Sequence, residues 1–270
     1  LQDVVRGFGA SKELLPDGTQ AQGSQGTGNG YISGVVDGGF AVTTTGSDSV
    51  YVNESAYTYV SWCMKAGGAA SSNSNGSITT SVSAADHGGF SVVSYTANDP
   101  ASVSTIGHGL SRVPALILVK GLSSVSNWAV YSEAIGGSSA TNASGENYVA
   151  YCFAKTPGLI GIGSYTGNGS SDGPMVIVDD GASGFRPAWL MIKSTGSGNW
   201  NIVDAARDPF NQISDGLRAN SSIAEFSGQA MDFIANGFKL RLSGADYNTS
   251  SQSYIYLAFA DEPFNLARAR

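Results

Sequence analysis

The sequence predicts an all-β protein made of tandem antiparallel β-sandwich-like modules. Only 13% of its 270 residues are charged, whereas 36 are glycine, which is typical of many short strands joined by tight turns. Apolar residues alternate with the two-residue period of a strand, and the 3.6-residue period of a helix is nearly absent. A polar turn followed by an apolar strand also occurs three times, which indicates a degenerate three-fold sequence repeat.

The repeated element, called here the Asn/Tyr unit, is an asparagine six residues before a tyrosine that begins a strand. Its three copies span residues 53–65, 142–154 and 248–260. One face of the third strand carries large apolar side chains, and the other carries tyrosine and alanine. The large ones are Ile255, Leu257 and Phe259. We expect the large face to cover the core and the small face to pack closely on a second sheet, as in a sandwich.

Two further segments repeat at nearly constant offsets, which supports duplication over chance similarity. They are residues 94–98 with 164–168 (164 − 94 = 70) and residues 114–120 with 187–193 (187 − 114 = 73). Pro114 and Pro187 each head a strand, where a missing N–H is tolerated. A polar loop then leads to a second strand that begins at Trp128 or Trp200, so each pair of strands is predicted to form a hairpin.

The repeats divide the chain into four predicted parts. These are repeat 1 at residues 1–68, a Gly/Ser-rich linker at 69–88, repeat 2 at 89–157, and repeat 3 with a C-terminal tail at 158–270. Within the linker, residues 77–83 alternate like a short exposed strand. Helix is expected only as a single turn at residues 11–15 and in the tail at residues 263–270.

Two copies depart from the full pattern. Repeat 1 begins partway through its module, so its missing strands come from an upstream segment, from a neighbouring subunit, or not at all. Because Leu1 is not an initiator methionine, we expect the chain to be a piece of a longer polypeptide. Repeat 2 is shortened, since Trp128 lies 14 residues before Asn142 whereas Trp200 lies 48 residues before Asn248, a difference of 34 (48 − 14).

Charge and cysteine usage exclude several classes of protein. The net charge is −7, from 14 basic and 21 acidic residues without a basic cluster, which argues against nucleic acid as a partner. No run of about 18 apolar residues predicts membrane insertion, and no secretory signal opens the chain. Cys63 and Cys152 occupy the same position of two repeats, so we predict small buried apolar residues and no disulfide between them.

Candidate chemistry is sparse, and the sequence predicts no catalytic residue and no enzymatic activity. Asp204 repeats as Asp3, each with an arginine three residues later, a pattern that favours a structural ion pair over a glycosidase carboxylate. Further carboxylates in repeat 3 are Asp208, Asp215, Glu225 and Asp232. Neither a nucleophile motif nor a phosphate-binding loop is present in the sequence.

Metal and cofactor binding is not expected. His108 lies between glycines, and we interpret it as a turn residue because it lacks convergent metal-ligating partners. The loop at residues 167–173 offers oxygens near Asn168 and Asp172 that could hold Ca²⁺. It lacks a regular series of acidic ligands, so a polar turn is the favoured interpretation.

Aromatic residues near loops are the speculative ligand-binding candidates. Trp128 and Trp200 recur after the hairpin loop, where aromatic rings can stack on sugars. Core packing also produces such recurrence and is the favoured interpretation. Tyr165 and Tyr247 lie near turns and are predicted surface aromatics. The Asn-x-Ser pattern of the Asn/Tyr unit formally matches a glycosylation acceptor, and a turn with a side chain bonded to backbone is the simpler interpretation.

Nearly the whole chain, from Asp3 to Phe264, resembles tandem-repeat structural proteins of tailed bacteriophages, especially the tail-fibre-like or virion-appendage proteins of marine phages. The segments that carry the resemblance are residues 105–110, 148–154, 164–169, 184–193, 204–209, 236–240 and 254–260. The resemblance implies an oligomeric virion component on the particle surface, with other virion proteins, copies of itself and host receptor or surface glycan as partners. It implies no catalytic residue and no cofactor. The alternative is a carbohydrate-binding module of a glycan-degrading protein.

Overall fold

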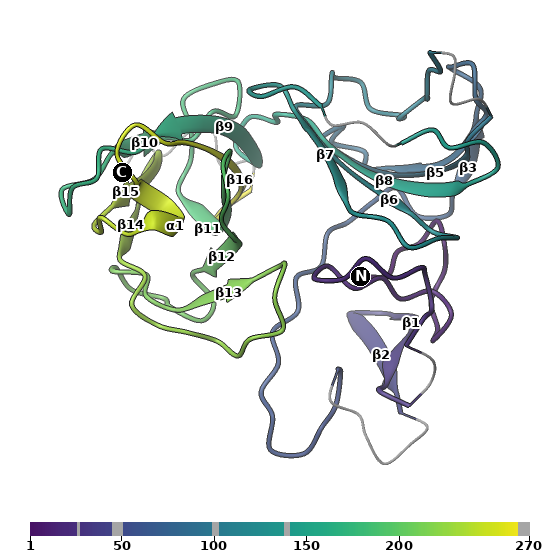
Figure 1. Ribbon diagram of the computed structural model, residues 1–270, viewed down its shortest axis with the longest axis horizontal. Helices are drawn as coiled ribbons and strands as arrows, with labels where there is room; N and C mark the ends of the chain where they lie inside the picture. The colour runs from purple at the N-terminus through teal and green to yellow at the C-terminus, as the bar shows by residue number, and fades with distance from the viewer. Residues whose placement is uncertain (26–27, 45–50, 99–102, 138–140, 264–270) are drawn as a thin grey trace. The chain divides into compact units, whose positions relative to one another are not determined.

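The computed structural model describes residues 1–25, 28–44, 51–98, 103–137 and 141–263, and these residues are nearly all β (Figure 1). They form sixteen strands in several antiparallel sheets and one four-residue helix, α1 (Ala245–Asn248). The predicted fold class, tandem antiparallel β-sandwich-like modules, is thereby confirmed. None of the helical structure in the described residues is long and apolar enough to cross a bilayer.

The chain forms two compact units. The first comprises residues 1–111, 117–130 and 138–152, and the second comprises residues 112–116, 131–137 and 153–270. Repeat 3 therefore forms most of the second unit. Repeats 1 and 2 and the predicted linker lie mainly in the first unit, so these two repeats do not form separate units.

The second unit is a sandwich of a five-stranded and a three-stranded sheet. The five-stranded sheet has the order β13-β12-β11-β16-β9, and the three-stranded sheet has the order β10-β15-β14. Their bounds are β9 (Ile160–Thr166), β10 (Met175–Ile177), β11 (Pro187–Ser194), β12 (Trp200–Asp204), β13 (Gly216–Arg218), β14 (Met231–Ile234), β15 (Gly237–Leu240) and β16 (Ser253–Ala260). The third Asn/Tyr unit supplies β16, which pairs antiparallel with both β9 and β11.

The core of this sandwich lies on the small face of β16. Tyr254, Tyr256 and Ala258 belong to one buried cluster with Phe233 and Phe238 of the three-stranded sheet. The expected close packing of the small face on a second layer is therefore confirmed. The large face is also buried, since Ile255 and Leu257 are 3% and 2% exposed. The expectation that the large face is the one that covers the core was wrong, because the core cluster of the sandwich lies on the small face. A central strand can bury apolar side chains on both faces.

The first unit contains most of a six-stranded sheet and a separate hairpin, and residues at the ends of three of the sheet's strands belong to the second unit. The sheet has the order β3-β4-β5-β8-β6-β7. The bounds are β3 (Ser71–Asn73), β4 (Thr80–Ala84), β5 (Phe90–Thr96), β6 (Leu116–Gly121), β7 (Ala129–Ser132) and β8 (Asn147–Phe153), with β1 (Tyr31–Val36) and β2 (Gly39–Thr43) forming the hairpin. The run β5-β8-β6-β7 repeats the run β9-β16-β11-β12 of the second unit. The predicted hairpins of residues 114–132 and 187–204 thus occupy equivalent places.

Several local expectations were wrong. The predicted linker at residues 69–88 contains β3 and β4, and Val82 is only 5% exposed, because its alternating residues extend the sheet beyond β5. Residues 59–65 form no strand, and Cys63 is exposed, whereas Cys152 is buried as predicted and both cysteines are free. A hydrogen-bonded turn replaces the helical turn near residues 11–15, and most of the C-terminal tail lies outside the described residues.

We predict that Phe238→Ala destabilises the second unit by about 3–5 kcal/mol, because it empties a fully buried site. The Phe238 ring packs edge-on against Tyr165 at 5.9 Å and Tyr256 at 5.4 Å. Urea denaturation followed by tryptophan fluorescence measures the loss. The matched control is Phe40→Ala, the equivalent position of repeat 1 (238 − 40 = 198), where the ring is 38% exposed and the cost is expected to be about 1 kcal/mol or less. Equal losses in the two variants would contradict this assignment of the core.

Candidate functional site

The Asn/Tyr unit forms the same turn in all three copies. In each, the tyrosine hydroxyl accepts a hydrogen bond from the backbone N–H five residues earlier. The pairs are Glu54 with Tyr59 at 2.8 Å, Ala143 with Tyr148 at 3.2 Å, and Thr249 with Tyr254 at 2.9 Å. A buried tyrosine needs a partner for its hydroxyl, and a turn needs a partner for its N–H groups. The repeat therefore encodes a structural turn, as the turn interpretation predicted.

Asn248 anchors the third turn and is completely buried. Its side-chain oxygen accepts from the Asn168 N–H at 2.8 Å, and its amide group donates to the carbonyls of Ser170 and Leu242, each at 2.8 Å. A side chain enclosed in this way has no room for a glycan. The formal glycosylation motif at Asn248 is thus a turn.

The Asp-x-x-Arg motif forms the same ion-paired turn in both units. In the second unit, Asp204 accepts from the Arg207 N–H at 3.0 Å and pairs with its guanidinium Nε at 2.7 Å. In the first unit, Asp3 accepts from the Arg6 N–H at 2.9 Å and pairs with its Nε at 2.6 Å. The predicted structural ion pair is confirmed at both places.

The arginine of each motif reaches a different second partner. Arg207 donates through Nη1 to Glu225 at 2.7 Å, whereas Arg6 donates through Nη2 to the Tyr151 hydroxyl of β8 at 3.1 Å. That hydroxyl donates in turn to Asp3 at 2.8 Å. Complete burial raises the pKa of Tyr151, so its hydroxyl stays protonated and able to donate. The N-terminal segment is thereby fastened to the sheet that repeat 2 supplies.

The carboxylates of repeat 3 that a hydrolase would need are engaged in structural contacts. Asp232 pairs with Arg241 at 2.7 Å. Asp208 accepts from the N–H groups of Ser214 at 2.6 Å and Asp215 at 2.7 Å. Together with the pairing of Asp204 and Glu225 on Arg207, these bonds account for most of the carboxylates that sequence reasoning considered.

The structure corrects the surface placement of two tyrosines. Tyr165 is 9% exposed and Tyr247 is 1% exposed, and both belong to the core cluster of the second unit. The Tyr165 ring stacks on Tyr254 at 5.0 Å, and its hydroxyl donates to the Tyr247 carbonyl at 2.7 Å. Their closeness to turns was misleading, because these turns fold back over the core. Neither ring presents a face on which a sugar could stack.

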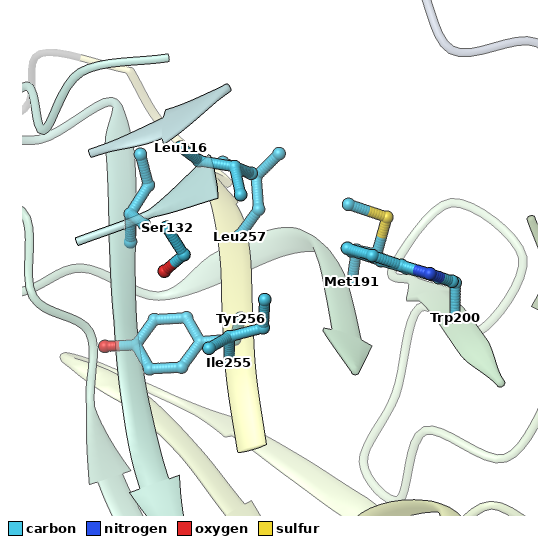
Figure 2. Close-up of a pocket in the computed structure, with 8 residues that line it drawn as sticks. Leu116, Ser132, Met191, Trp200, Ile255, Tyr256 and Leu257 are labelled. Carbon is cyan, nitrogen blue, oxygen red and sulfur yellow. The ribbon is translucent and has the colours of Figure 1, made fainter. Parts of the chain in front are cut away.

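Trp128 and Trp200 are half-buried, and each packs against residues of its own unit. The Trp128 indole donates to the Leu15 carbonyl at 3.2 Å, and its ring lies 6.3 Å from that of Tyr151. Trp200 lines an apolar hollow of the second unit with Met191, which Figure 2 shows on the side of β16 away from the Tyr256 ring. The hollow leaves no space for a water molecule, so it is a packing defect and no binding pocket.

The predicted calcium loop has internal partners for its polar groups. Asp172 pairs with Lys239 at 2.6 Å, and this ammonium lowers the pKa of the Asp172 carboxyl. The Asn168 side-chain oxygen accepts from the Ser170 N–H at 3.0 Å and from the Asn248 amide at 3.0 Å. Within the described ranges, no group of three or more His, Cys, Asp or Glu side chains could hold a metal ion. The favoured interpretation as a polar turn accounts for these contacts.

The two histidines form turns of one type. His108 Nδ1 accepts from the Leu110 N–H at 3.1 Å, and His87 Nδ1 accepts from the Gly89 N–H at 3.1 Å. Partial burial lowers the pKa of both imidazoles, which favours the neutral form that this acceptor role requires. The predicted turn role of His108 is confirmed.

A shallow polar groove in the first unit was missed by sequence reasoning. It has a volume of about 410 Å³ and runs along β3 and β4, with Ser72, Asn73 and Asn75 among its lining residues. The Asn73 side-chain oxygen accepts from the Asn75 N–H at 2.8 Å and so fixes the loop between the strands. The low-complexity composition of residues 69–76 was the available signal, and it was taken for a linker.

Tandem β-sandwich-like modules, held by repeated turns and ion pairs, define the class of this protein. The chain belongs to the family described as a domain of unknown function, DUF7483, whose model matches residues 1–141 and again residues 134–263. The two matches fit tandem modules and meet inside predicted repeat 2. Neither the curated proteins nor the solved structures include a match to the chain.

We predict that Tyr151→Phe lowers the free energy of unfolding by about 1–3 kcal/mol, because it removes the hydroxyl through which β8 binds Asp3 and Arg6. Chemical denaturation measures the loss, and limited proteolysis of the N-terminal segment should accelerate with it. The matched control is Tyr57→Phe at a ring that is 63% exposed, where we expect no measurable change. A neutral Tyr151→Phe would contradict a fastening role for this hydroxyl.

Proposed function

We propose that the chain is a structural, non-enzymatic component of a bacteriophage particle, placed on the particle surface as part of a tail-fibre-like appendage that contacts the host receptor or a surface glycan. The observation that carries this proposal is the tandem arrangement of antiparallel β modules held by the repeated Asp-x-x-Arg and Asn/Tyr turns. Such modules give a rigid scaffold, and loops on a rigid scaffold are where recognition residues concentrate. The resemblance in sequence to phage tail-fibre-like proteins supports the same role.

The groove along β3 and β4 is the surface we propose for host contact. Its serine hydroxyls and asparagine amides can donate to and accept from the hydroxyl groups of a sugar. It is shallow, which suits an extended surface polysaccharide better than a small enclosed ligand. Because the chain carries a net charge of −7, a neutral glycan is a better match than an acidic one.

We predict that Ser72→Arg weakens binding of the chain to host-type surface polysaccharide by about tenfold or more, because the long side chain fills the groove. Ser72 is an exposed residue of β3. Binding to a glycan array and to intact bacterial cells measures the effect. The control is Ser197→Arg, which places the same side chain in the exposed loop between β11 and β12.

The phage role also predicts association. Light scattering after size-exclusion chromatography should give a mass above that of one chain, and antibodies against the chain should label intact particles. A monomer that binds neither cells nor virion proteins counts against the proposal.

The alternative is a carbohydrate-binding module of a glycan-degrading protein, favoured by Trp128 and Trp200, which are only half-buried and begin equivalent strands of the two hairpins. This role predicts that Trp200→Ala or Trp128→Ala abolishes glycan binding, whereas the groove proposal predicts that both variants keep it as long as they fold. The two variants therefore separate the proposals in one assay.

A further inference from the structure

Both histidines of the chain close a turn with the same hydrogen bond. His87 Nδ1 accepts from the Gly89 N–H, and His108 Nδ1 accepts from the Leu110 N–H, each at 3.1 Å. A neutral imidazole can accept through one ring nitrogen, whereas an imidazolium carries a proton on both nitrogens and can only donate. Each turn is therefore closed only while its histidine is neutral.

Other turns of the chain make this bond with a side chain that does not titrate. The Asn73 side-chain oxygen accepts from the Asn75 N–H at 2.8 Å, and that of Asn168 accepts from the Ser170 N–H at 3.0 Å. An asparagine oxygen remains an acceptor at every pH. The histidine turns have the same pattern of bonding and depend in addition on protonation.

The His108 turn forms part of one wall of the polar groove along β3 and β4. Its central residue, Gly109, has a φ of +72°, and a Cβ added there would lie 2.7 Å from Val82 Cγ1 of β4. Gly109 and Val82 both line the groove. The segment that leads into the turn is fixed on β4, because the Thr80 hydroxyl donates to the Gly107 carbonyl at 3.1 Å. Beyond that bond, the turn that His108 closes holds Gly109 against the strand.

The His87 turn supports the same wall. It lies in the loop from β4 to β5, which begins directly after the groove residue Ala84. A Cβ added to Gly88 would lie 2.5 Å from the Ser111 Oγ, so this turn packs against the chain that leaves the His108 turn. A change in either turn therefore reaches the groove.

We propose that the two histidine turns are a pH-sensitive switch of the groove, which keeps its wall in place at neutral pH and releases it in acid. Protonation of His108 replaces an acceptor by a donor, so the Leu110 N–H loses its partner and Gly109 can leave β4. Protonation of His87 removes the support behind that turn. The inference rests on the proposed function in one respect only, that displacement of the wall weakens the binding of a neutral glycan.

The surroundings of the two imidazoles set the direction of the response. Burial lowers the pKa of His87 and outweighs Asp86, which raises it, while Lys65 lowers it further. Burial also lowers the pKa of His108, and no charged side chain among the described residues adds to that shift. The folded chain thus binds these protons less readily than the unfolded chain, in which histidine has its ordinary pKa of 6.5. The stability that the turns contribute is complete above this pKa and is lost as the pH falls through the lowered values.

Two double variants of the full chain test the switch. His87→Asn with His108→Asn keeps an acceptor for each N–H and removes the titration, as in the turn of Asn73. His87→Ala with His108→Ala removes the acceptor at every pH. Amide hydrogen exchange is followed at Gly89 and Leu110. The wild type is compared with each variant at the same pH, so the intrinsic effect of pH on exchange cancels.

We expect the wild type to exchange like the asparagine variant at about pH 7.5 and tenfold or more faster at about pH 5, because open turns no longer protect the two N–H groups. The alanine variant should exchange fast at both. Nuclear magnetic resonance titration of the wild type should give imidazole pKa values below 6.5. Binding to a neutral polysaccharide should weaken in acid by about tenfold in the wild type and stay constant in the asparagine variant.

Equal pH dependence of exchange in the wild type and the asparagine variant would overturn the proposal, as would imidazole pKa values of 6.5 or above. This comparison also decides the matter if the alanine variant does not fold. Glycan binding that is constant with pH while the turns open would overturn the link to the groove. A chain that binds no glycan at either pH contradicts the proposed function instead, and the exchange rates still show whether the turns open.

Discussion

Burial of the central strand on both faces is the constraint on which each complete module depends. In the second unit, β16 pairs with β9 on one side and β11 on the other, and its alternate side chains enter different layers. Tyr254 and Ile255, neighbours in sequence, are 0% and 3% exposed although they point to opposite faces. The backbone of the strand is therefore fully paired, and its side chains are buried, only when two flanking strands and a covering layer are present together. Its turn has no such requirement.

The local turns form the same way in different surroundings. The bond from an N–H to the tyrosine hydroxyl closes the Asn/Tyr turn in repeat 1 as in repeats 2 and 3, and the Asp-x-x-Arg turn is alike at Asp3 and Asp204. Both devices join residues three to five positions apart, so little chain entropy opposes them. What varies is the packing around the turns, since Tyr254 is 0% exposed in repeat 3 whereas Tyr59 is 47% exposed in repeat 1.

The sequence was sufficient to predict what depends on neighbours in the chain. The period of the strands, the two hairpins, the ion-paired turns and the role of His108 all follow from spacing. It was insufficient for what depends on contacts between distant segments. Tyr165 was placed at the surface because it lies near a turn, yet its ring is covered by Tyr254, 89 residues away (254 − 165 = 89). The segment with β3 and β4 was predicted to be a linker with one short exposed strand at residues 77–83. Serine and glycine give no packing signal, so neither the strand pair nor the burial of Val82 could be predicted.

In the first unit, the Asp-x-x-Arg motif of repeat 1 contacts the sheet of repeat 2, which has no such motif of its own. Repeat 2 lacks an Asp-x-x-Arg motif after β7, where Ser132 stands four residues after Trp128 as Asp204 stands four after Trp200. The N-terminal segment that carries the motif of repeat 1 contacts the same sheet through two hydrogen bonds. Arg6 donates to the Tyr151 hydroxyl, and the Trp128 indole donates to the Leu15 carbonyl. Leu257, which replaces Tyr151 in the second unit, could not make this bond, and there Glu225 pairs with the arginine in its place. The arginine of repeat 3 thus finds its second partner within its own repeat, whereas the arginine of repeat 1 finds it in repeat 2.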